Sequence, residues 1–119
     1  RGPCLVHERR RGCRDMSGRL EAFRAMVAKN PANMQARFGL ANEAVKAGML
    51  DEAVEHYTVY LAGFDDEGNG YARLAAALEQ LGRTDEAREA LGRGIAAASQ
   101  HGHPSMAAEL EERLDELGA

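Results

Sequence analysis

Residues 39–61 read GLANEAVKAGMLDEAVEHYTVYL, and residues 73–95 read RLAAALEQLGRTDEAREALGRGI. The two stretches lie 34 residues apart and align without a gap. Over residues 36–61 and 70–95, seven of the 26 aligned positions are identical, including Gly48 with Gly82 and the DEA triplets at 51–53 and 85–87. A period of this length indicates a repeat architecture, in which one supersecondary unit stacks on the next.

Each unit is predicted to contain two helices separated by a glycine. In the first unit we expect helices over residues 33–47 and 51–63, with Asn33 as the N-cap of the first. Gly48 ends that helix, because glycine readily adopts the left-handed conformation of a helix stop. The second unit repeats this plan, with a stop at Gly82 and Thr84 as the cap of the next helix.

A further helix is predicted on each side of the two units. Leu20, Phe23 and Val27 form a helical stripe that matches the second helix of a preceding unit. Met106, Leu110, Leu114 and Leu117 form a narrow stripe beside acidic residues, as in a capping helix with a polar outer face. We therefore expect an all-α protein of about six helices. Its parts are a disordered tail (1–16) and one domain (17–119) with a partial repeat (17–32), two repeats (33–66 and 67–100) and a capping helix (103–117).

Charge and hydropathy exclude several classes of protein. The net charge of −4 divides into +3 for residues 1–15 and −7 for the other 104 residues. An acidic body is unsuited to nucleic acid, because neutralising phosphates requires a basic surface. No apolar run approaches the roughly 18–20 residues that span a bilayer. We therefore expect neither nucleic acid nor a membrane as a partner.

The first 15 residues hold both cysteines, Cys4 and Cys13. Two incidental thiols are typical of a reducing compartment, so the sequence predicts a cytoplasmic protein. Cys4, His7 and Cys13 lack a fourth ligand and a zinc-site spacing, so we expect no metal and no cofactor. Because helical periodicity begins just after Met16, one hypothesis is that Met16 is the natural start and residues 1–15 are upstream sequence.

Small and apolar residues recur at matching places in the two units. They are Leu40, Ala41, Ala44, Gly48, Ala53, Tyr57 and Leu61 in the first, and Tyr71, Leu74, Ala75, Leu78, Gly82, Ala87, Leu91, Gly94 and Ile95 in the second. This pattern resembles the tetratricopeptide repeat, over about residues 17–117. The resemblance implies an α–α superhelix. The chain departs from the family pattern in several places. Arg37 replaces a large aromatic residue, and Tyr60 replaces a small alanine, which predicts altered spacing in the first repeat. The proline that follows the second helices is also missing, and Asp65 and Ser99 stand there instead.

The resemblance also implies a concave groove, lined by the first helix of each pair, that binds a peptide or a partner's helix. The groove positions are Gln35, Phe38, Asn42 and Lys46 in the first repeat, Asn69, Arg73 and Gln80 in the second, and His103 at the capping helix. Asn42 is expected to hold a ligand backbone, and Lys46 and Arg73 to pair with acidic groups. Of the residues with which some family members grip the carboxylate of chaperone tails, only Asn42 is present, which disfavours that partner class.

The sequence thus predicts a non-enzymatic adaptor or scaffold that binds a protein or peptide partner. It contains no phosphate-binding loop, no metalloprotease helix and no nucleophile with a base. His101 and His103 flank Gly102 in a loop, and we interpret them as exposed residues rather than a metal site. The alternative hypothesis is a self-associating structural module, a homodimer that pairs through exposed end faces: Tyr60, Phe64 and the stripe of the terminal helix.

Overall fold

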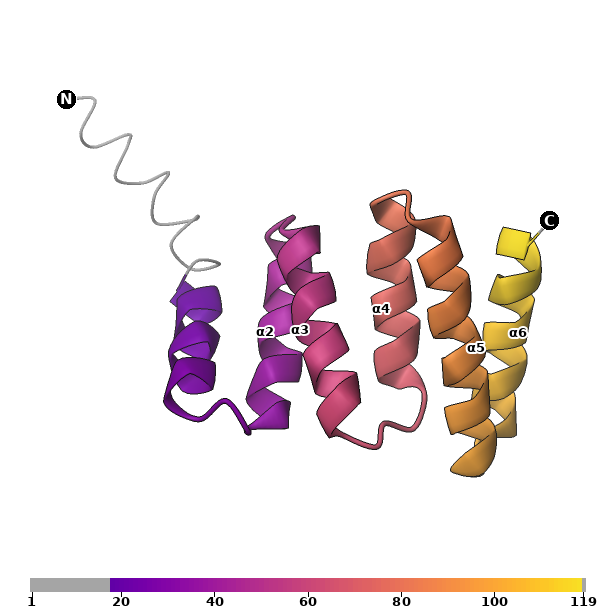
Figure 1. Cartoon of the computed structure of the whole chain (residues 1–119), viewed down its shortest axis with the longest axis horizontal. Coiled ribbons are helices and arrows are strands. Elements are labelled where there is room, and N and C mark those ends of the chain that lie inside the picture. The colour runs from indigo at the N-terminus through magenta and orange to yellow at the C-terminus, as the bar shows by residue number, and fades with distance from the viewer. Residues whose placement is uncertain (1–17, 119) are drawn as a thin grey trace.

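The computed structural model describes residues 18–118, and within them the chain forms six helices and no strand (Figure 1). The prediction of an all-α fold is therefore confirmed. The helices are residues 18–29, α2 (Met34–Lys46), α3 (Leu50–Gly63), α4 (Asn69–Gln80), α5 (Thr84–Gln100) and α6 (Pro104–Gly118). The expected tail, with Cys4, His7 and Cys13, lies outside the described residues, so the cytoplasmic location remains a prediction. No helix within 18–118 is both long enough and apolar enough to cross a membrane.

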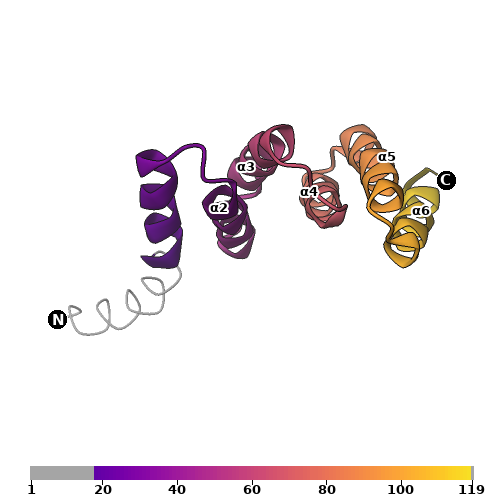
Figure 2. The same cartoon turned by 90° about the horizontal axis from the view of Figure 1, so that it is seen from below.

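The helices stand side by side as antiparallel neighbours (Figure 1). Seen along the helices, α2, α4 and α6 lie on one side of the array, and α3 and α5 lie on the other (Figure 2). The predicted first helices of the repeats thus share one face, and the second helices share the opposite face. We call these the α2–α4–α6 face and the α3–α5 face.

Three of the connections between helices are the same glycine turn. Gly48, Gly82 and Gly102 have φ values of 79°, 78° and 77°, the left-handed region that glycine enters without a steric penalty. In each turn the N–H after the glycine donates to the carbonyl five residues earlier, as from Met49 to Ala44 at 2.8 Å. This Schellman geometry satisfies carbonyls that a helix end leaves unpaired. The stops predicted at Gly48 and Gly82 are confirmed.

Of the two predicted helix caps, one is confirmed and the other is wrong. The Asn33 side chain accepts a hydrogen bond from the Ala36 N–H at 3.1 Å, so this N-cap is confirmed. Thr84 was the wrong residue for the cap of α5, because it is already the first helical residue, and Arg83 stands in the cap position without a side-chain bond. The cause is the compact glycine turn, in which Arg83 both closes α4 and precedes α5.

The core consists of two apolar clusters joined at α4. One contains residues of the helix 18–29, α2 and α3, and the other contains residues of α3 to α6. Ala41 and Ala53 in the first cluster, and Ala75 and Ala87 in the second, are fully buried, which lets each pair of helices approach closely. Leu74 packs against both clusters, so the apolar interior is continuous along the array.

Candidate functional site

The predicted site residues lie on the α2–α4–α6 face. Gln35, Lys46, Asn69, Arg73 and Gln80 are exposed, whereas Phe38, Asn42 and His103 are half-buried. Those on α2 and α4 come from successive turns of two neighbouring helices, while His103 lies in the turn before α6. The predicted set is therefore polar apart from the Phe38 ring, and its members come from both repeats and from the turn before α6.

Three of these residues, Phe38, Asn42 and Arg73, form one cluster. The Arg73 guanidinium lies 5.7 Å from the centroid of the Phe38 ring, within cation–π range. Its Nη1 lies 3.5 Å from Asn42 Oδ1. In the described part of the chain Arg73 forms no ion pair. The cluster thus carries a positive charge that no carboxylate of residues 18–118 neutralises directly.

Tyr57 of α3 contacts this cluster from the interior of the protein. It is almost fully buried, and its hydroxyl donates to Asn42 Oδ1. Burial raises the pKa of Tyr57 above its usual value, so the phenol keeps its proton and remains a donor. Because an arginine can only donate, the Asn42 oxygen must face Arg73 and Tyr57, and its NH₂ group points away from both. The amide is therefore oriented with two donors available on its other side.

The remaining site residues do not join this cluster. The Lys46 ammonium lies 3.3 Å from the carboxylate of Glu43, a buried acid that Arg19 also approaches at 3.4 Å. His103 Nε2 lies 2.6 Å from Glu67 Oε1. Lys46 thus already has a partner within the chain.

The two loop histidines face separate carboxylates. His101 Nε2 lies 3.2 Å from Asp65 Oδ1, and His103 pairs with Glu67, so the loop over residues 101–103 lies beside the loop over residues 64–68. Among the described residues, no group of three or more His, Cys, Asp or Glu side chains is arranged to hold a metal ion. The geometry here therefore consists of two side-chain contacts between loops, of which the contact of His103 with Glu67 is a hydrogen bond.

Comparison with known proteins places this architecture in a family. A family model described as tetratricopeptide repeat matches residues 14–98. The chain belongs to the tetratricopeptide repeat family. It is 30% identical over 98 residues to the TPR repeat-containing protein PA0015 of Pseudomonas aeruginosa, a match that covers 82% of this chain and 93% of that relative.

Solved tetratricopeptide structures share the fold. PcrH in complex with the chaperone binding region of PopD superposes with a TM-score of 0.78 at 18% identity, over 96% of this chain and 86% of PcrH. The TPR2B domain of yeast Sti1, in its pHsp70 complex, gives 0.77 at 17% identity, over 96% and 91% of the two chains. MamA gives 0.67 at 19% identity, over 92% and 72%. The predicted superhelix is therefore confirmed.

Arg37, the first departure from the tetratricopeptide pattern, belongs to a polar network that the sequence did not reveal. Its Nη1 lies 3.3 Å from His56 Nδ1, and His56 Nε2 lies 3.3 Å from Glu52 Oε2. Arg24 of the helix 18–29 donates twice to the same carboxylate, at 2.7 and 3.1 Å. Arg24, and to a smaller degree His56, lowers the pKa of Glu52. The network ties three helices together, and its one sequence signal is the i, i+4 spacing of Glu52 and His56.

Tyr60, the second departure, anchors the loop between α3 and α4. Its hydroxyl donates to Asp66 Oδ2 at 2.7 Å, and both residues are buried. Asp66 Oδ1 also accepts from the N–H groups of Gly68 and Gly70, at 2.7 and 2.8 Å, and so caps the start of α4. Burial, together with the bond to Asp66, raises the pKa of Tyr60. A large residue replaces the usual alanine here, and its polar end organises the following loop.

Most of the residues that were expected to pair two copies of the chain pack instead against its own core. Tyr60 is 6% exposed and stacks against Phe38 and Phe64, with ring centroids 4.7 and 5.2 Å away. In the stripe of α6, Leu110 is buried, and Met106, Leu114 and Leu117 pack against the second cluster. The expectation that Tyr60 and this stripe are exposed end faces is wrong, because both complete the core. Phe64 alone of that set remains 47% exposed.

Proposed function

We propose that this chain is a non-enzymatic interaction module that binds a peptide or a helix of a partner protein on its α2–α4–α6 face. The observation that carries the proposal is the Phe38–Asn42–Arg73 cluster, which two successive repeats build together on the buried Tyr57. Each member offers a different contact to a polypeptide. The Asn42 NH₂ donates to a backbone carbonyl, Arg73 pairs with a carboxylate, and Phe38 packs an apolar side chain.

Preorganisation supports binding at this cluster. Tyr57 and Arg73 fix the Asn42 amide before any ligand arrives, which reduces the entropy lost on binding. None of the three side chains is a nucleophile or a general base near neutral pH, so the cluster is suited to recognition rather than to catalysis. Lys46 contributes less than its charge suggests, since Glu43 already holds it.

Two of the similar structures are complexes with segments of other proteins: PcrH with the chaperone binding region of PopD, and the Sti1 TPR2B domain with pHsp70. They support recognition of a segment of a partner in general. The partner class itself differs from a chaperone tail, because Phe38, Arg73 and His103 occupy positions where the carboxylate-gripping members of the family carry other residues.

The test is an affinity pull-down from native cell extract, read by mass spectrometry. The intact chain is compared with Arg73→Glu, and with a variant that combines Arg73→Glu and Asn42→Ala. Lys29→Glu with Gln100→Ala is the matched control, since both residues are exposed and lie outside the cluster. Circular dichroism confirms that each variant is folded, because Asn42→Ala leaves the Tyr57 hydroxyl without its acceptor.

A partner captured by the intact chain and the control, but lost from both Arg73 variants, would support the proposal. A partner retained by both Arg73 variants would overturn binding at this face. Recovery of the chain alone would favour self-association instead.

A further inference from the structure

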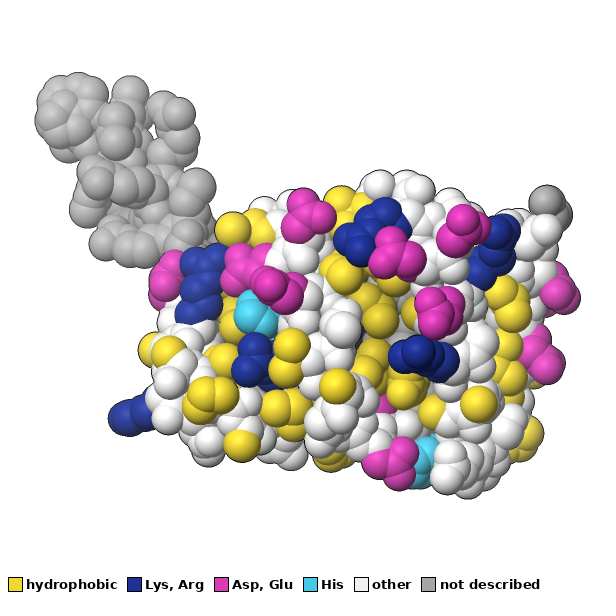
Figure 3. Space-filling model, in the orientation of Figure 1, with side chains coloured by type: hydrophobic (Ala, Val, Ile, Leu, Met, Phe, Trp, Pro, Cys, Tyr) yellow, Lys and Arg dark blue, Asp and Glu magenta, His cyan; other side chains and the backbone are white. Residues whose placement is uncertain are grey.

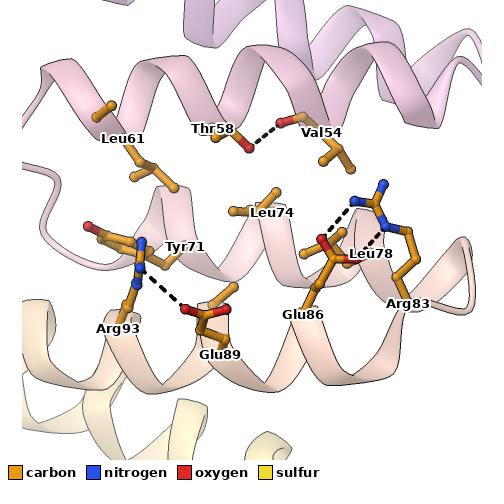
Figure 4. Close-up of a pocket in the computed structure, with 12 residues that line it drawn as sticks. Val54, Thr58, Leu61, Tyr71, Leu74, Leu78, Arg83, Glu86, Glu89 and Arg93 are labelled. Carbon is orange, nitrogen blue, oxygen red and sulfur yellow. Dashed lines mark hydrogen bonds and ion pairs between the residues drawn. The ribbon is translucent and has the colours of Figure 1, made fainter.

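The α3–α5 face carries a cleft with a volume of about 430 Å³, which falls within the roughly 300–1,000 Å³ of ligand-binding clefts. It lies between α3 and α5, and α4 forms its floor (Figure 4). In the space-filling view, apolar side chains lie open between charged ones on this face (Figure 3). The cleft is on the opposite side of the array from the Phe38–Asn42–Arg73 cluster.

The two long walls of the cleft differ in chemistry. The α3 wall and the floor are largely apolar, with Leu61, Leu74 and Leu78 facing the cavity. The α5 wall is charged but internally paired. The Arg83 guanidinium donates to both oxygens of Glu86 at 2.6 and 2.7 Å, and Arg93 lies 3.3 Å from Glu89. An occupant must therefore present an apolar face to α3 and α4, and it meets no net charge along α5.

One end of the cleft continues into an acidic hollow. Val54 and Arg83 line both, and the hollow adds the carboxylates of Asp51, Glu52 and Glu55. Arg24 engages Glu52, but Asp51 and Glu55 form no ion pair within residues 18–118. Both are exposed. The surface as a whole is an apolar trough that leads into negative charge.

We propose that this cleft is a second docking site, and that its occupant is a basic amphipathic segment of a partner protein. Apolar side chains at helical spacing (i, i+3 or i+4, i+7) fill the trough over Leu61, Leu74 and Leu78, as helices fill apolar grooves in other complexes. Lysines or arginines at one end of the segment lie against Asp51 and Glu55. Charge complementarity commits the site to a basic partner, and residues 18–118, whose side chains carry a net charge of −7, attract such a segment.

The test uses a labelled synthetic peptide of about 15 residues, with three leucines at helical spacing and four lysines in its last turn. Fluorescence anisotropy measures its binding to the full chain, beside a peptide in which glutamates replace the lysines. We expect the lysine peptide to bind at least about tenfold more tightly than the glutamate peptide at low salt, and to weaken as salt screens the acidic hollow.

Two pairs of matched variants locate the binding site. Thr58→Arg places a long side chain in the cleft, whereas Val59→Arg makes the same change at an exposed neighbour outside the lining. Glu55→Lys reverses a charge in the hollow, whereas Glu112→Lys reverses one on α6. We expect the Thr58 and Glu55 variants to bind at least about fivefold more weakly, and both controls to bind within about twofold of the wild type.

Three results would overturn this proposal: equal weakening by variants and controls, equal binding of the two peptides, or no binding at about 500 µM protein. A wild-type chain that is oligomeric while Thr58→Arg is monomeric would assign the cleft to a second copy instead. The Arg73→Glu variant is expected to bind the lysine peptide as tightly as the wild type does. The assay therefore tests this cleft independently of the proposed site on the α2–α4–α6 face.

Discussion

The junction between α3 and α4 and the junction between α5 and α6 occupy equivalent places in the repeat, yet they are packed in opposite ways. At the first, Tyr60 of α3 is the large residue, and Gly70 of α4 makes room for it. A Cβ at Gly70 would lie 2.9 Å from the Tyr60 ring. At the second, the position 34 residues after Tyr60 is Gly94 of α5. A Cβ there would lie 3.1 Å from Leu110 of α6, and 2.9 Å from the Tyr71 Cβ of α4.

The loops that connect the helices at these two junctions also differ. Residues 64–68 link α3 to α4 through the Asp66 cap, whereas the short glycine turn over residues 101–103 links α5 to α6. At the start of the array, Phe23 lies against Gly39, again with the large residue on the second helix of a pair. The comparison teaches that helices approach closely where a glycine of one helix faces a larger side chain of a neighbour. The glycine is on the later helix, Gly70 of α4, at the first junction, and on the earlier helix, Gly94 of α5, at the second.

The largest effect is expected from removing the Tyr60 ring. Tyr60→Ala empties the centre of the α3–α4 junction and leaves the buried Asp66 without its phenol donor, so we expect a loss of about 3–5 kcal/mol in the free energy of unfolding, measured by urea denaturation. Phe64→Ala, in the same stack but 47% exposed, is the control and should cost about 1 kcal/mol or less. Equal losses for the two variants would contradict a junction centred on Tyr60.

A second prediction concerns Gly94 of α5, which lies against Tyr71 of α4 and Leu110 of α6. Gly94→Ala places a Cβ 2.9 Å from the Cβ of Tyr71, which cannot swing away, so we expect a loss of about 1–3 kcal/mol. Gly92→Ala is the control on the same helix, with nothing within 4 Å of the added Cβ, and it should gain roughly 0.5–1 kcal/mol from helix propensity. The same denaturation assay measures both. A gain from Gly94→Ala would contradict close packing of Gly94 against Tyr71 and Leu110.

The smallest effect is a pH dependence of the free energy of unfolding, which arises from the Tyr60 hydroxyl at the α3–α4 junction. Because the pKa of Tyr60 is raised in the folded chain, its contribution is complete below about pH 10, where the unfolded tyrosine still holds its proton. Stability then falls as pH rises above that value, since the unfolded chain releases a proton that the folded chain retains. Tyr60→Phe should cost about 1 kcal/mol at neutral pH and make the alkaline decline shallower. Denaturation between neutral pH and about pH 11 measures this, and an unchanged slope would contradict it.

Features that depend on local spacing could be predicted from the sequence. The all-α class, the repeat register, the Asn33 cap and the stops at Gly48 and Gly82 each depend on residues within about one helical turn or on a simple translation. The placement of Phe38, Asn42 and Arg73 near one another followed from the family resemblance. Their role as partner-binding residues remains a prediction.

Features that depend on how far apart the helices stand could not be predicted. The bond from Tyr60 to Asp66 needs the course of the loop, and the contact of Arg37 with His56 needs the packing of α2 on α3. The apolar cleft exists because α3 and α5 are separated over α4, which no single position in the sequence specifies. The error over exposed end faces has the same origin, since burial of Tyr60 depends on Gly70 of the next helix.

Leu74 has a consequence for cooperativity. In a linear array, the stability of the whole is a sum of unit terms and nearest-neighbour couplings, and the repeats unfold together where the coupling is strong. Leu74 belongs to the second repeat but packs against both apolar clusters, so the unfolding of α4 removes support from each of them. The amides of α4 should therefore exchange with solvent only as fast as global unfolding permits, and the array should melt as one cooperative unit rather than fray repeat by repeat.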